Sequence, residues 1–104
     1  MERRGSTPPD KALPRAYLAR GRFLLQMGKY DRARPDLEYV VQKDFKSPDP
    51  WLYMGLENLA THNCHEGRGD LEKAAELMST PLATLVKEHQ AFIDKTPCKD
   101  DVLN

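Results

Sequence analysis

Two stretches of sequence decide the fold: YLARG at residues 17–21 and, 34 residues later, WLYMG at residues 51–55. In each stretch an aromatic residue, Tyr17 or Trp51, precedes a glycine, Gly21 or Gly55, by four positions. Self-similarity at a fixed period of this size is typical of proteins built from stacked helical repeats. The sequence therefore predicts two successive helical hairpins.

A second shared element follows each stretch. It reads GKYDRA at residues 28–33 and GDLEKA at residues 69–74, and both copies have the form Gly-x-Tyr/Leu-x-x-Ala. Small residues at such positions let two paired helices approach closely. Because Gly55 precedes Ala74 by seven residues more than Gly21 precedes Ala33, we expect an enlarged loop in the second hairpin.

The period and the residue types resemble the tetratricopeptide repeat family over residues 14 to 81. The departures from the family pattern include Arg20 where leucine is expected and Leu24 where tyrosine is expected. The resemblance implies two repeats of antiparallel helices closed by a C-terminal capping helix. It assigns repeat-signature packing to Tyr17, Gly21, Gly28, Tyr30, Ala33, Trp51, Gly55 and Ala74.

Length and composition predict a single small all-α domain of about five helices, since 104 residues can bury one core. The expected organisation is a flexible lead-in at 1–13, one helical domain at 14–96 with repeats at 14–47 and 48–80 and a capping helix at 81–95, and a tail at 97–104.

Turn and capping signals set the expected helix boundaries. The first helix stops at Gly28, which tolerates positive φ, and the second spans residues 30–43 with Pro35 near its start. Asp49 and Pro50 are expected to cap and begin the third helix. An extended loop over 62–69 then leads to a fourth helix from Asp70 to about Met78, and to the amphipathic capping helix.

Charge and hydropathy exclude several classes of function. Sixteen basic and sixteen acidic side chains cancel, so a nucleic-acid partner is not expected. The chain shows neither the run of ~20 apolar residues needed to cross a bilayer nor a secretory signal at its start. We therefore expect no membrane insertion and, by default, a cytoplasmic location.

The functional prediction rests on the concave side, which the first helices of successive repeats line in this family. By resemblance, the groove residues are Arg15, Leu18, Arg22, Leu25, Gln26, Leu52, Leu56 and Leu59. This set predicts an apolar groove with a basic edge, suited to a partner protein or peptide with apolar anchors and acidic character. We expect a non-catalytic interaction module without cofactors.

Two alternatives stay open for the same surface. The fifth helix could cover Leu52, Leu56 and Leu59, or a second copy of the protein could do so, which would make the protein a self-associating structural module and a homodimer.

The loop at 62–66 brings His62, Cys64, His65 and Glu66 together in the sequence. Imidazole and thiolate are the usual zinc ligands, but the spacing lacks a second ligand pair, so no metal site is expected. Cys64 beside His65 also suggests a thiol nucleophile, although no oxyanion donor accompanies it. Solvated loop residues are the favoured interpretation.

The two cysteines, Cys64 and Cys98, are candidates for a disulfide. In an up-and-down helix order the third and fifth helices run in the same direction, so both cysteines emerge on one side of the stack. Such a bond would favour a periplasmic or secreted location over the default. Free thiols are the alternative.

Overall fold

The computed structural model describes residues 13–103, so the predicted lead-in lies outside the described residues except for Leu13. The described chain is all-α, as expected. In chain order its elements are α1 (Pro14–Gln26), α2 (Tyr30–Lys43), α3 (Pro48–Ala60), α4 (Cys64–Met78), α5 (Leu82–Glu88), α6 (Gln90–Ile93) and a short 3-10 helix, η1 (Lys99–Asp101). Within residues 13–103, no helix combines the length and the apolar character that crossing a bilayer requires.

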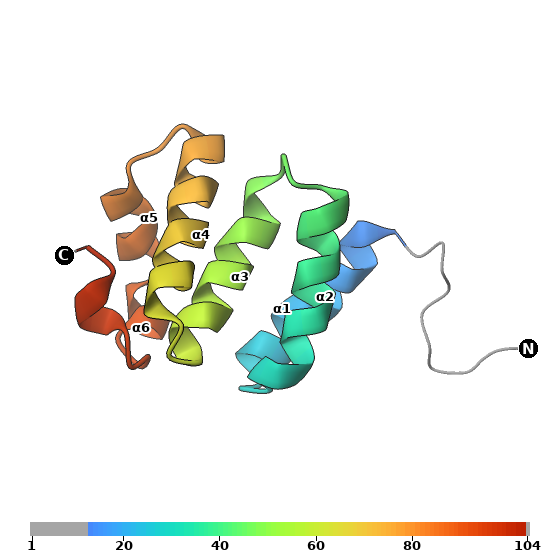
Figure 1. Ribbon diagram of the computed structural model, residues 1–104, viewed down its shortest axis with the longest axis horizontal. Helices are drawn as coiled ribbons and strands as arrows, with labels where there is room; N and C mark the ends of the chain where they lie inside the picture. The colour runs from blue at the N-terminus through green and yellow to red at the C-terminus, as the bar shows by residue number, and fades with distance from the viewer. Residues whose placement is uncertain (1–12, 104) are drawn as a thin grey trace, which may run out of the picture.

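The helices form two antiparallel hairpins, α1 with α2 and α3 with α4, arranged side by side along the long axis of the molecule (Figure 1). The α3 helix packs on both α2 and α4 and so joins the hairpins. At the far end, α5 and α6 lie against α4 and α3. The predicted capping position of the C-terminal helical segment is thus occupied.

The 34-residue period extends through both hairpins. The α1, α3 and α5 helices begin at Pro14, Pro48 and Leu82, and α2 and α4 begin at Tyr30 and Cys64. The turns also correspond: Gly28 has φ 77° and His62, 34 residues later, has φ 69°. In both turns the next residue has φ −94° and ψ 67°. The two hairpins therefore share one backbone design.

The enlarged loop predicted for residues 62–69 is wrong, because residues 64–69 form the first turns of α4 and only His62 and Asn63 remain in the turn before it. Consequently Asp70 lies inside a helix and does not cap one, and the counterpart of Ala33 is Gly67 and not Ala74. Gly69 suggested a turn, but one exposed glycine costs a helix only about 1 kcal/mol. Packing of the rest of α4 on α3 outweighs that cost.

Glycines set the distance between α3 and α4. A Cβ added to Gly67 would lie 2.7 Å from Cδ2 of Leu59 and 3.0 Å from the carbonyl oxygen of Gly55. In the first hairpin, a Cβ on Gly21 would lie 2.8 Å from Cδ2 of Leu37. Each helix pair therefore approaches more closely than side chains at these positions would allow, as expected for Gly21 and Gly55.

The unexpected arginine at position 20 has a clear role in the first hairpin. Its Nε donates to Oδ2 of Asp36 at 2.6 Å and its Nη2 donates to Oδ1 at 2.7 Å. This bidentate hydrogen bond raises the pKa of Arg20 above its ordinary value. Next to it, the rings of Tyr17 and Tyr39 stack with centroids 4.1 Å apart. Ion pair and ring stacking thus join α1 to α2.

Three boundaries differ from expectation. The α3 helix begins at Pro48 after Ser47, two residues before the predicted first residue Pro50, because the earlier proline also suits a first-turn position. The single helix predicted over 81–95 is interrupted at His89, whose φ of −118° is not helical. Beyond it, the segment expected as a tail buries Cys98 and Val102 in the core.

Candidate partner-binding groove

Four of the eight predicted groove residues are buried. Leu25, Leu52, Leu56 and Leu59 have exposed fractions of 4%, 3%, 3% and 0%. They belong to the core cluster that also includes Val86 of α5 and Ile93 of α6. The prediction that these leucines are open to a partner is therefore wrong, because the core that includes the C-terminal helices encloses them.

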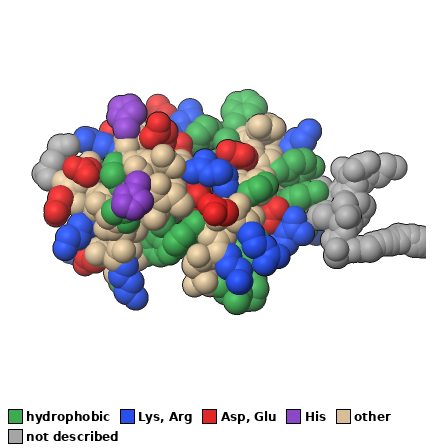
Figure 2. Space-filling view, turned by 60° about the horizontal axis from the view of Figure 1, so that its bottom comes forward, with side chains coloured by type: hydrophobic (Ala, Val, Ile, Leu, Met, Phe, Trp, Pro, Cys, Tyr) green, Lys and Arg blue, Asp and Glu red, His purple; other side chains and the backbone are tan. Residues whose placement is uncertain are grey.

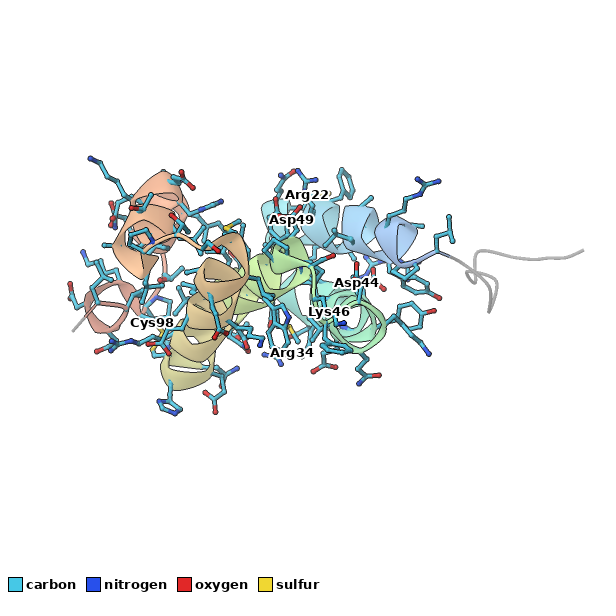
Figure 3. All side chains as sticks on the ribbon, turned by 90° about the horizontal axis from the view of Figure 1, so that it is seen from above. Arg22, Arg34, Asp44, Lys46, Asp49 and Cys98 are labelled. Carbon is cyan, nitrogen blue, oxygen red and sulfur yellow. A yellow bond between two sulfur atoms is a disulfide. The ribbon has the colours of Figure 1, made fainter. Side chains whose placement is uncertain are left out.

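The other four predicted groove residues keep some exposure. Arg15, Arg22 and Gln26 are exposed and Leu18 is half-buried. The guanidinium of Arg22 lies 5.1 Å from the ring centroid of Tyr53, so this cation–π contact connects α1 to α3. Figure 3, seen from above, shows Arg22 and Asp49 on the same side of the molecule. The basic edge of the predicted groove is thus present, but its wide apolar floor is not.

An open groove lies between the end of α1 and the segment after α6. It has a volume of about 380 Å³. Its walls are formed by Leu25, Gln26, Met27, Gly28, Tyr30, Phe92, Lys95 and Thr96. The α1–α2 turn and this segment lie on the lower side of the molecule in Figure 1, and Figure 2 turns this side toward the reader. The groove thus retains Leu25 and Gln26 from the predicted set and adds residues from the C-terminal segment.

The groove combines apolar walls with one cation. Met27 is 53% exposed, Tyr30 and Phe92 are half-buried, and Lys95 is exposed. Methionine adapts its shape to different apolar side chains, and an aromatic ring provides a rigid contact surface. A site of this kind can accept an apolar side chain while the ammonium of Lys95 attracts a neighbouring carboxylate.

The disulfide holds the C-terminal wall of the groove in place. Cys64 at the start of α4 is bonded to Cys98, with Cα atoms 5.4 Å apart, so the predicted pairing is confirmed. Between α6 and Cys98, the hydroxyl of Thr96 donates to the carbonyl of Ile93 at 2.7 Å and accepts from the N–H of Cys98 at 3.3 Å. The wall from Phe92 to Thr96 is therefore fixed at both ends.

A polar cluster lies where the two hairpins meet. Arg34 of α2 places Nη2 2.9 Å from Oε1 of Glu57, which is fully buried in α3. The same nitrogen donates to Oδ1 of Asn58 at 2.5 Å, and Nδ2 of Asn58 donates to Oδ2 of Asp70 at 2.7 Å. Nη1 of Arg34 also lies 3.5 Å from Oε2 of Glu38. One guanidinium thus serves three carboxyl groups, those of Glu38 and Glu57 directly and that of Asp70 through the amide of Asn58.

Burial disfavours the ionised form of both carboxyl groups. It raises the pKa of Glu57 above its ordinary value, and the nearby Arg34 only partly opposes this. Burial likewise raises the pKa of Asp70 to about 6, against the opposing hydrogen bond from Asn58. Ionisation of these groups therefore destabilises the fold near neutral pH.

This junction predicts a pH-dependent stability difference between the wild type and an Asp70→Asn variant. Because the folded pKa of Asp70 lies above the unfolded value, its contribution is fully present below about pH 4 and is lost as the pH rises through about 6. Raising the pH from 4.5 to 7.5 should therefore favour Asp70→Asn over wild type by about 1 kcal/mol, after allowance for solvent screening. Urea unfolding across this pH range measures the difference, and a pH-independent difference would contradict the assignment.

No metal-binding cluster is present in the described residues: no group of three or more His, Cys, Asp or Glu side chains there is placed to hold an ion. Within the predicted loop set, His62 lies in the turn before α4, whereas Cys64, His65 and Glu66 form its first turn. The sulfur of Cys64 is bonded to Cys98, so the thiol required by the nucleophile alternative is absent.

Comparison with known proteins finds no match. No family model, no curated protein and no solved structure matches this chain. Membership of the tetratricopeptide repeat family therefore stays a prediction based on residues and spacing.

The sequence did not predict the roles of several residues of structural or functional interest. They are Gly67, the junction residues Arg34, Glu57 and Asn58, and the groove residues Met27, Phe92, Lys95 and Thr96. For Gly67 a signal existed, since it follows Ala33 by 34 residues. The others depend on contacts between hairpins and with the C-terminal segment, for which the repeat spacing gives no signal.

Proposed function

We propose that this protein is a non-catalytic interaction module of tetratricopeptide repeat type, which holds a short segment of a partner protein in the groove between α1 and Phe92–Thr96. The main support is the groove itself, with about 380 Å³ of open volume between apolar walls and a lysine at its edge. This volume fits one or two side chains and is too small for a long helix.

The proposed ligand segment carries an apolar anchor followed by an acidic residue. The anchor would displace water from Met27, Tyr30 and Phe92, and this burial supplies affinity. The carboxylate would pair with Lys95 at the rim, which supplies orientation more than affinity. Arg22 and Arg15 along α1 would extend the same preference for acidic partners.

Charge reversal at the rim tests this proposal. We expect a Lys95→Glu variant, used as bait in an extract of the source cells, to lose partners that the wild type retains, because it repels the acidic residue of the ligand. The matched control is Lys87→Glu, which reverses another exposed lysine, on α5 and outside the groove. Mass spectrometry of the retained proteins measures the difference.

The comparison of the two variants decides the outcome. Partners retained by wild type and Lys87→Glu but lost by Lys95→Glu support binding in the groove. Partners lost equally with both variants indicate a general charge effect, and identical sets for all three baits contradict the proposed site.

A further inference from the structure

The outward face of α1 carries an exposed apolar stripe whose last residue, Met27, also lines the groove. Phe23 and Met27 are 58% and 53% exposed, and Ala16 lies on the same helical face, seven residues before Phe23. Residues at this spacing share one side of a helix. Figure 2 shows hydrophobic side chains at the right-hand end of the molecule, over the first hairpin.

The 34-residue period shows what such a face does elsewhere in the molecule. Advancing the stripe by one period leads from Ala16, Phe23 and Met27 to Pro50, Glu57 and Thr61 of α3. On α3 these positions meet the preceding hairpin: Pro50 and Glu57 are almost fully buried, and Glu57 lies 2.9 Å from Arg34 of α2. The stripe on α1 is thus the counterpart of a face that packs on a helix.

The residue types on this face suit an apolar partner surface. Where α3 presents the carboxylate of Glu57 to an arginine, α1 presents the ring of Phe23, and where α3 has Thr61, α1 has Met27. A helix that packs here as α2 packs on α3 would bury both side chains. Burial of large apolar side chains of this kind favours association.

Arginines flank the stripe on both sides. Arg15 and Arg22 of α1 are exposed on one side. On the other side, Arg20 of α1 and Arg32 of α2 line a shallow hollow of about 440 Å³ together with Asp31, Pro35 and Asp36. Asp36 in this hollow is already bound by both nitrogens of Arg20. In the hollow, Asp31 and Asp36 balance the charges of Arg20 and Arg32. The α1 helix itself contains no acidic residue, and Arg15 forms no ion pair within residues 13–103, so the flank with Arg15 and Arg22 carries an excess of positive charge.

We propose that this face of α1 is a docking surface for an acidic amphipathic helix of a partner chain, which packs its apolar stripe on Phe23 and Met27 and directs carboxylates to Arg15 and Arg22. The charge pattern argues against a second copy of α1 as the occupant, because self-pairing would bring the arginine flanks of two copies together. This surface adjoins the groove that carries the proposed function and shares Met27 with it, whereas Phe23 lies outside the groove walls.

Two synthetic helical peptides of about 20 residues, long enough for measurable helicity, test the proposal. Both carry the same leucine and alanine stripe, flanked by glutamates in one and by lysines in the other. Fluorescence anisotropy with the full chain should show at least about tenfold tighter binding of the glutamate peptide. Phe23→Ser should weaken this binding about tenfold, which corresponds to the loss of one anchor ring.

Phe45→Ser is the matched control, because Phe45 is 57% exposed in the linker between α2 and α3, away from the stripe. It should leave binding unchanged, and circular dichroism should show equal helicity for both variants. Equal binding of the two peptides, or equal effects of the two substitutions, would overturn the proposal.

Two further outcomes would also overturn the proposal, and each would identify a different binding site or occupant. If Lys95→Glu abolishes peptide binding and Phe23→Ser does not, the peptide occupies the groove. If sedimentation shows a dimer that Phe23→Ser dissociates, the occupant of the face is a second copy. If Lys95→Glu retains the same partners as the wild type while Phe23→Ser weakens peptide binding as expected, the proposed function alone is contradicted.

Discussion

Replacement of both Cys64 and Cys98 by alanine is expected to lower the free energy of unfolding by about 4 kcal/mol. The disulfide joins residues 34 positions apart, and its removal restores to the unfolded chain the conformations that this loop excludes. A loss of this size is a large fraction of the stability of a small domain. Urea unfolding followed by circular dichroism measures it.

Reduction of the wild type should reproduce the effect of the double substitution. Hydrogen exchange should then rise selectively in residues 92–103, because the wall of the groove is held between α6 and the disulfide. The α1–α2 hairpin serves as the internal control, since the disulfide does not join it to that segment. A loss below about 1 kcal/mol, or uniform exchange along the chain, would contradict this account.

Gly67→Val is expected to destabilise the fold by about 3 kcal/mol, the upper end of what overpacking costs. Even the first added carbon would lie 2.7 Å from Leu59 and 3.0 Å from the backbone oxygen of Gly55. The leucine can rotate, but the backbone oxygen cannot move unless α3 and α4 separate. The midpoint of thermal unfolding should fall accordingly.

Gly69→Val provides a control in the same helix. Nothing lies within 4 Å of a Cβ built on Gly69, so the added side chain projects into open space. Valine and glycine differ little in helix propensity, and we expect a change within about 0.5 kcal/mol. Equal effects of the two substitutions would mean that helix propensity, and not the close approach of α3 to α4, explains Gly67.

The sequence predicted the elements whose signals are local or periodic. The aromatic and glycine residues at 17, 21, 51 and 55 predicted two helical hairpins, and Gly28 predicted the end of α1. The predicted start of α4 was wrong because it followed the local signal of Gly69 and not the 34-residue period. Gly69 suggested a turn, whereas one period after Ala33 would have led to Gly67 and to a helix that begins at Cys64.

The groove shows the limit of such reasoning. Helical spacing correctly placed Leu52, Leu56 and Leu59 on one face of α3, but spacing cannot tell whether a face meets solvent or another helix. Their burial depends on where the chain after residue 82 returns, and the open volume that remains is bounded by Phe92 and Lys95, far from α1 in the sequence.

By itself, then, the sequence determined that the chain forms paired helices with a 34-residue period and that Cys64 can meet Cys98, because helix spacing and glycine placement act over short distances. Only the tertiary structure decided which apolar faces stay exposed, where Arg34 finds Glu57, and how burial raises the pKa of Asp70. Those properties depend on the desolvation of one segment by another, and desolvation is set by the packed arrangement as a whole.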